Sequence, residues 1–320
     1  MPCRRFPAKP DARGRACGDP SLVSHAALGR ILRGVSASRW RSVLFDGIAV
    51  LSLALCLTFL TLPLVAVFLR IPVGELIRQM ASDVAVDALL VTAKTSAISQ
   101  LIIVGIGTPA AYVLAMAAFR GRSFLVTLIE LPLVLPPAVA GIALLVAFGR
   151  LGLLGGTLSR LGVEVGFTQA AVVMAVVFVA GPFYVRQAIA AFQGVDSDLL
   201  AASRTLGAGS ARTFWRVALP LAARGLAAGL ALSFARGVGE FGATLFFAGS
   251  FPGVTQTLPL AIYAQFDVNL ESALGISALL VAVSASVLLV VKLLPGRAGL
   301  GAPPPFFFPS WRQLSRGPRS

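Results

Sequence analysis

Two charged residues within an apolar stretch are spaced to interact. Arg236 and Glu240 lie four residues apart, so on a helix they share one face and can neutralise each other. Ionisable groups in apolar segments are costly and are usually paired or functional. Two interpretations stay open: a structural ion pair, or a pair that lines a polar path in which Arg236 attracts an anion. Lys94 and Glu130 are comparable cases.

Hydroxyls, prolines and glycines recur in the same stretches. Hydroxyls at Thr92, Thr95, Ser96, Ser99 and Thr244 can donate to an anion, although such residues are also common between packed helices. Prolines free backbone carbonyls and glycines allow close approach, so as a set they predict hinges, with simple kinks and tight packing as the alternative. The path or hinge candidates are Pro132, Pro136, Pro137, Arg236, Gly237, Gly239, Glu240, Gly242 and Thr244.

Several chemistries lack the residues they need. His25 is the only histidine, and the three cysteines have no metal-ligand spacing, so we expect no metal site and no Ser/His catalytic pair. None of the three lysines follows a glycine, so the chain has no G-K-[ST] phosphate loop. We therefore expect a chain that is not an enzyme and binds no cofactor of its own.

The composition predicts the elements that hold these residues. The chain is 57% hydrophobic and 12% charged, with a mean hydropathy of +0.87, values typical of multi-spanning membrane proteins. A membrane-spanning helix needs about 20 apolar residues. We therefore predict an all-α polytopic membrane protein with six transmembrane helices, over residues 43–69, 88–118, 123–148, 169–191, 221–248 and 272–294.

The distribution of Lys and Arg predicts the orientation. Nine basic residues precede the first span and five more begin at Lys292, whereas the opposite loops hold few. We expect both termini in the cytoplasm, with a disordered basic tail over 1–40, a permease domain over 41–295 and a flexible tail over 296–320. The net charge of +14 thus reflects membrane topology and not nucleic-acid binding.

A polar segment interrupts the apolar pattern at 196–220. Asp196 and Ser197 predict a helix start, Gly207 a left-handed helix end, and Ser210 the cap of a second short helix. Leu199, Ala202, Ser203 and Leu206 form an apolar face on the first helix. On the second, Phe214, Val217 and Leu221 form one side, with Arg212 and Arg216 on another, able to snorkel toward headgroups.

Three interpretations of this segment compete. It is a solvated loop, a DNA-binding helix-turn-helix, or a lever on which a cytoplasmic motor acts. Both ends join membrane spans within a few residues, which leaves little reach into a DNA groove. The lever interpretation is favoured, because any motion of the paired helices passes directly into the flanking spans.

The motifs resemble those of ABC importer permeases. Ala202–Gly207, then nine residues, then Val217–Pro220 is similar to the EAA segment that docks on the ATPase, although Ala201 stands where the family usually has Glu. The stretches at 105–115, 131–155 and 239–263 resemble the molybdate permease subunit of the molybdate/tungstate/sulfate group. Ser250 stands where Asn is common in these permeases.

The resemblance implies an architecture and partners. It implies type I importer architecture in the bacterial inner membrane, a homodimer, a cytoplasmic ATPase dimer that carries ATP and Mg, and a periplasmic or lipid-anchored oxyanion-binding protein. The implied ATPase-coupling residues are Asp198, Ala201, Ala202, Ser203, Arg204, Thr205, Leu206, Gly207, Leu219 and Pro220. Molybdate is the expected substrate, with sulfate, thiosulfate or tungstate as alternatives. An ATP-independent carrier or channel would leave 198–220 unexplained.

Overall fold

The computed structural model describes residues 25–117 and 119–293. Helix α1 (His25–Leu69) belongs for most of its length to a separate unit that ends at Pro63, and its apolar part spans Gly47–Leu69. Because α1 begins at His25, the predicted disordered tail over 1–40 is wrong for residues 25–40. Ala, Leu and Arg are frequent there and favour continuation of the helix.

The second unit contains the remaining helices. They are α2 (Val73–Met80), α3 (Asp83–Met116), α4 (Arg122–Val134), α5 (Pro137–Phe148), α6 (Gly155–Arg160), α7 (Gln169–Gln193), α8 (Ser197–Thr205), α9 (Ser210–Thr213), the π-helix η2 (Phe214–Ala218), α10 (Leu219–Val238), α11 (Gly242–Ala248), α12 (Leu258–Phe266) and α13 (Leu270–Leu293). The described residues contain helices and no strands, which confirms the all-α prediction.

Five described helices are long and apolar enough to cross a membrane, and α4 with α5 makes a sixth span if the bent pair counts as one. The prediction of one continuous helix over 123–148 is wrong, because the chain bends by 113° between α4 and α5, at Leu135 and Pro136. The predicted span over 221–248 is likewise broken between α10 and α11. Helices α2, α6 and α12 were not predicted.

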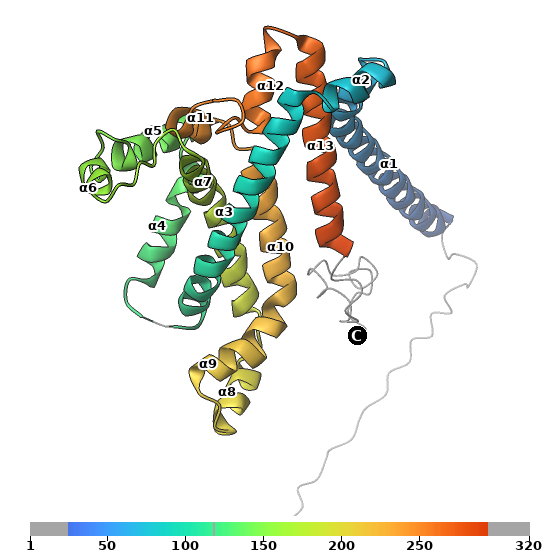
Figure 1. Ribbon diagram of the computed structural model, residues 1–320. Coiled ribbons are helices and arrows are strands. Elements are labelled where there is room, and N and C mark those ends of the chain that lie inside the picture. The colour runs from blue at the N-terminus through green and yellow to red at the C-terminus, as the bar shows by residue number, and fades with distance from the viewer. Residues whose placement is uncertain (1–24, 118, 294–320) are drawn as a thin grey trace, which may run out of the picture. The chain divides into compact units, whose positions relative to one another are not determined.

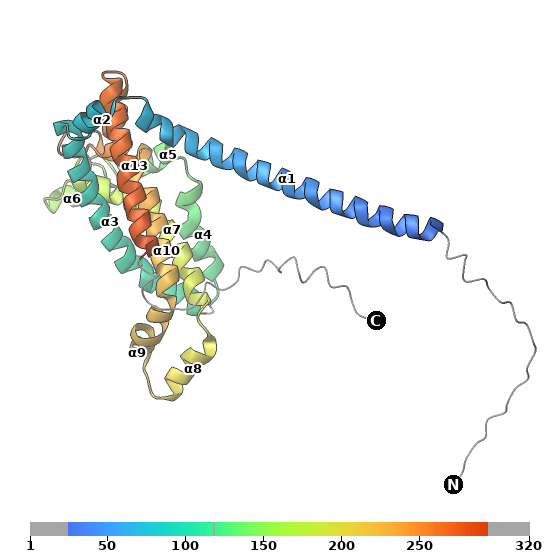
Figure 2. The same ribbon diagram turned by 90° about the vertical axis from the view of Figure 1, so that its right-hand side faces the viewer.

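Helix α7 is the centre of the bundle, with α3 and α10 packed along it (Figures 1 and 2). On α10, a small residue recurs every fourth position at Gly225, Gly229, Ser233 and Gly237. A Cβ added at Gly225 would lie 2.4 Å from the Cβ of Ala191 on α7, closer than any normal contact. Small residues therefore let α7 and α10 approach closely, as they do between membrane helices in general.

Polar contacts fix the same three helices. The Ser233 hydroxyl on α10 donates to the Ala180 carbonyl at 3.0 Å, and the hydroxyls of Thr108 on α3 and Tyr184 on α7 lie 2.6 Å apart. All these side chains are buried. These hydrogen bonds fix the positions of α3 and α10 along α7.

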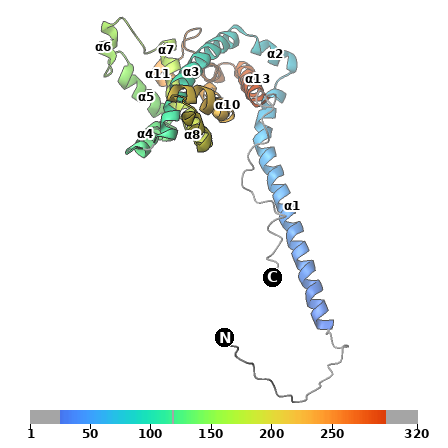
Figure 3. The ribbon, with the colours of Figure 1, turned by 90° about the horizontal axis from the view of Figure 1, so that it is seen from below.

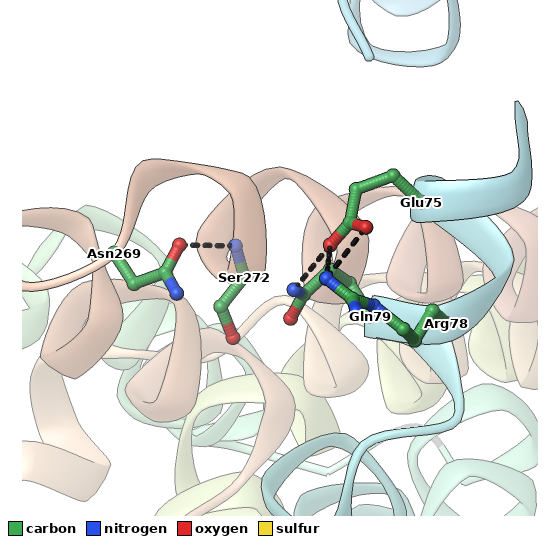
Figure 4. A network of polar contacts seen from close by, with 5 residues as sticks. All are labelled: Glu75, Arg78, Gln79, Asn269 and Ser272. Atoms are coloured by element: carbon green, nitrogen blue, oxygen red, sulfur yellow. Dashed lines mark hydrogen bonds and ion pairs between the residues drawn. The ribbon is translucent and has the colours of Figure 1, made fainter. Parts of the chain in front are cut away.

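Helices α2, α12 and α13 gather at the end of the bundle opposite α8 and α9 (Figure 1). Helix α2 crosses α13 closely at Gly275, where a Cβ would lie 2.4 Å from that of Gln79. On α2, Glu75 accepts hydrogen bonds from Gln79 and Arg78 at 2.7 and 2.8 Å, close to Ser272 and its cap Asn269 (Figure 4). Two hydrogen bonds lower the pKa of the Glu75 carboxyl below its ordinary value, and the one from Gln79 has a larger effect than the one from Arg78.

Candidate functional site

The polar segment forms the predicted helix, turn and helix. The Asp196 carboxylate caps α8 by accepting from the Asp198 N–H at 2.9 Å. Gly207 has the expected left-handed backbone, with φ of +82°. Its N–H donates to the Arg204 carbonyl and the next N–H donates to the Ser203 carbonyl, a complete Schellman motif. We name residues 197–218 the docking segment.

The second half of the docking segment is continuous with a membrane span. α9, η2 and α10 run without a break from Ser210 to Val238, 29 residues in all. At 1.5 Å per residue this is a rod of about 43 Å. Pro220 has no N–H for the carbonyl one turn earlier, and the wider π turn just before it gives room for the proline ring. The prediction that Ser210 caps this helix is wrong, because Gly209 is the N-cap and Ser210 is the first residue of α9.

The docking segment is anchored to the bundle by its own core. Leu200 of α8 and Ala218 of η2 are buried in one hydrophobic cluster with residues of α3, α7 and α10. Tyr112, Phe192 and Phe214 form an aromatic triad there, with ring centroids 4.8 to 6.2 Å apart. Neither the triad nor the role of Leu200 was predicted, although aromatic residues flanking a polar segment were the available signal.

The structure gathers most of the predicted coupling residues at one end of the bundle. α8 carries Asp198, Ala201, Ala202, Ser203, Arg204 and Thr205; Leu206 and Gly207 form the turn, and Leu219 and Pro220 begin α10. The hydroxyls of Ser203 and Thr213 lie 3.0 Å apart and join α8 to α9. Figure 3 looks onto this end of the bundle.

The predicted faces of the docking segment are only partly correct. The predicted face of α8 is present, since Leu199, Ala202, Ser203 and Leu206 line one groove. It is exposed, however: Leu199 and Leu206 are 49% and 88% exposed, and Leu200 is the buried residue of α8. Arg212 and Arg216 were assigned to a side apart from Val217. All three instead line one open groove.

The breaks in the two discontinuous spans touch each other. A Cβ added at Gly242, the first residue of α11, would lie 2.8 Å from the Cβ of Pro137, the first residue of α5. One turn further along α5, a Cβ at Gly141 would lie 2.7 Å from the Ala243 carbonyl oxygen. Pro136 and Gly239 are the terminal caps of α5 and α10, whereas Pro132 lies inside α4. Pro136, Pro137 and Gly242 thus meet at one joint between α5 and α11, whereas Gly237 packs against Val176 of α7.

Arg236 and Glu240 bridge the α10–α11 break. The predicted pair is confirmed: the Arg236 guanidinium lies 2.7 Å from Oε2 of Glu240. The other carboxylate oxygen, Oε1, accepts from the Ala243 N–H at 2.7 Å, at the start of α11. The Glu240 side chain is 1% exposed and that of Arg236 29% exposed. One carboxylate therefore links the end of α10 to the start of α11, and the arginine balances its charge.

The other polar candidates are dispersed. The hydroxyls of Thr92, Thr95 and Ser99 donate to backbone carbonyls one turn earlier on α3, which favours an interface role over anion binding. Thr92 also accepts from the Leu258 N–H at 2.8 Å and so fixes the start of α12. Thr244 is fully buried on α11, Lys94 is exposed on α3, and Glu130 of α4 lies 3.5 Å from Arg186 of α7.

These features define a class. A bundle of membrane-spanning helices with two facing breaks, and a helical segment that protrudes from one end as the extension of a span, is the architecture of a transport permease. Residues 107–298 match the family described as the binding-protein-dependent transport system inner membrane component. The chain belongs to this family of multi-pass inner-membrane permeases and is therefore a transmembrane subunit.

Several relatives of the chain have names that refer to molybdenum transport. The chain is 45% identical over 235 residues to the molybdenum transport system permease protein ModB of Mycobacterium tuberculosis, covering 73% of this chain and 89% of the relative. It is 38% identical over 281 residues to a probable molybdenum ABC transporter permease protein of Haloferax volcanii, covering 85% and 98%. Escherichia coli ModB is 40% identical over 178 residues, covering 55% and 78%.

Solved structures share the fold. A bacterial ABC transporter that imports the acidic polysaccharide alginate superposes with a TM-score of 0.65 at 15% identity, covering 85% of this chain and all of that one. That transporter has also been solved with a pentasaccharide-bound periplasmic protein. The methionine transporter MetNI, in an inward-facing form, gives a TM-score of 0.53 at 20% identity, covering 65% and 93%. At these identities the likeness concerns the fold alone.

Proposed function

We propose that this chain is the permease subunit of an ATP-driven importer of molybdate. Two copies form a central path, a separate ATPase dimer holds ATP and Mg and grips the docking segments, and an oxyanion-binding protein delivers substrate on the outer side. Both termini are cytoplasmic. The chain itself binds no cofactor.

One observation carries the ATP-driven part of the proposal. The docking segment is the direct extension of α10, and Leu200 and the aromatic triad join it to α3 and α7. A passive carrier or channel has no use for a protruding rigid segment of this kind. A partner that moves the segment also moves α10, whose far end carries the Arg236–Glu240 bridge.

The cycle follows from this connection. ATP binding closes the ATPase dimer and draws the docking segments together, which opens the path outward; hydrolysis resets it. The path does not hold its anion tightly, because a pore that binds tightly cannot release. The ion-paired Arg236 suits this requirement, since Glu240 already balances its charge. Selectivity therefore lies mainly with the external binding protein.

Molybdate is proposed over related oxyanions because the relatives at 38% to 45% identity carry molybdenum in their names. The test is uptake of labelled molybdate into proteoliposomes that hold the permease and its genomic-neighbour ATPase, with binding protein outside and ATP inside. We expect ATP-dependent uptake that excess sulfate does not suppress. Suppression by sulfate would move the assignment to a sulfate or broad oxyanion importer. Uptake without ATP would overturn the coupling role of the docking segment.

A further inference from the structure

An open groove runs along the docking segment. It has a volume of about 590 Å³ and lies between α8 on one side and α9, η2 and the start of α10 on the other. Its lining consists of Leu199, Ala202, Ser203, Leu206, Ala208, Arg212, Arg216, Val217, Pro220 and Leu221. The Ser203–Thr213 contact and the Gly207 turn hold its two walls together. The groove is thus a built feature of the segment and not a gap between mobile loops.

The walls of the groove are apolar and uncovered. Leu199, Leu206 and Leu221 are 49%, 88% and 52% exposed. Leu200 is the buried residue that anchors α8 in the core, so the leucines of this face are not needed to hold the segment on the bundle. An exposed apolar face that the fold does not use is typical of an interaction surface.

The charge of the groove has one sign. Arg212 and Arg216 lie one turn apart, both are exposed, and none of the described residues that line the groove is acidic. Asp196, the N-cap of α8, and Asp198 in its first turn are not among the lining residues. Ala201 contributes no carboxylate. A complementary partner must therefore present negative charge beside apolar surface.

The position of the groove favours a protein over a lipid. α7 has 25 residues, so it is about 37 Å long and already exceeds the roughly 30 Å hydrocarbon core. α8 follows beyond the end of α7 and protrudes from the bundle (Figures 1 and 2). The α8 wall of the groove therefore lies past the hydrocarbon, where a soluble partner has access.

We propose that this groove receives a segment of the ATPase subunit that places an apolar side chain between the leucines and a carboxylate against Arg212 and Arg216. The proposal rests on the proposed function and specifies its contact chemistry: at this contact the permease supplies the cations and the motor supplies the acid. Because Ala201 supplies no carboxylate to the partner, Arg212 and Arg216 on the facing helix supply the charged contact instead.

The experiment measures binding of the purified ATPase to full-length permease in nanodiscs, across a series of salt concentrations. The double variant Arg212→Gln, Arg216→Gln should bind roughly tenfold more weakly, with a smaller salt dependence, because two partly exposed ion pairs are lost. The double Lys variant should retain most of the binding. Arg120→Gln is the matched control: Arg120 is exposed in the turn before α4, is not one of the coupling residues and does not line the groove, so its variant should bind within about twofold of wild type.

The outcomes separate the alternatives. Equal binding by wild type and the double Gln variant overturns the proposal while the proposed function stands. An equal loss in Arg120→Gln shows only a general attraction to basic charge and also overturns it. A loss confined to nanodiscs with anionic lipid identifies a headgroup as the occupant. If the wild type does not bind the ATPase at all, the proposed function itself fails.

Discussion

Replacement of Gly207 tests whether the docking turn couples the segment to a motor. Gly207 has φ of +82°, and a Cβ added there would meet nothing within 4 Å. The cost of a side chain is therefore purely conformational: a left-handed backbone costs a non-glycine residue about 1–2 kcal/mol. We expect about a fivefold shift away from the native turn for Gly207→Ala and about thirtyfold for the β-branched Gly207→Val. Gly207→Asn should lie nearest wild type, because Asn tolerates this conformation.

Gly209 provides the matched control. It lies two residues away, also has open space around its Cβ position, and has an ordinary φ of −67°. Gly209→Ala therefore adds the same atom without the backbone cost. Membrane yield and size-exclusion profile should be the same for all variants, whereas ATP-driven uptake and ATPase affinity should fall in the order Asn, Ala, Val at position 207. Uptake by Gly207→Val equal to that of Gly209→Ala would refute the coupling role of the turn.

Three further predictions concern the bundle. Arg236→Ala leaves the buried Glu240 carboxylate without its cation, so thermal unfolding should show a loss of about 2 kcal/mol or more together with reduced uptake, with partial rescue by Lys; wild-type stability and uptake would mean that the pair has neither role. Gly225→Ala should destabilise by about 1–3 kcal/mol because α10 must move away from α7, whereas Gly105→Ala, in open space, should not. Because its hydrogen bonds lower the pKa of Glu75, the stability that this carboxylate contributes is present at neutral pH and is lost as the pH falls through its folded pKa. Hydrogen-exchange protection factors in α2, which are corrected for the intrinsic pH dependence of exchange, should therefore fall in acid for wild type, and less so for Glu75→Gln.

Local signals in the sequence predicted local structure well. The cap at Asp196, the left-handed Gly207 and the Arg236–Glu240 pair each depend on residues within a few positions of one another, and the structure has all three. Apolar length likewise predicted most of the spans, because that signal is a sum over about 20 residues. Termini in the cytoplasm and the function of individual site residues stay predictions.

The features that the sequence could not predict depend on distant contacts. The joint between Pro137 and Gly242 joins positions more than a hundred residues apart. Consecutive prolines favour a break before α5, but local propensity does not predict that the two breaks meet. The same holds for the faces of α8: periodicity finds an apolar stripe at Leu199 and Leu206, but only the packed bundle decides that Leu200 is the buried residue. Because Leu200 is the buried residue, Leu199 and Leu206 are left exposed and line the groove.

Helix α10 connects the two candidate sites physically. Its rod begins in the docking segment at Ser210 and ends beside the Glu240 bridge, and along this length small residues face α7. Such a face lets α10 pack closely on α7, and the Ser233–Ala180 hydrogen bond fixes its register there, so the two helices are firmly coupled. The rod ends where its chain is no longer helical, and the Glu240 carboxylate there holds the first turn of α11, which rests on α5 at Gly141. A displacement at the docking segment therefore reaches the joint between the two broken spans through one helix and one carboxylate.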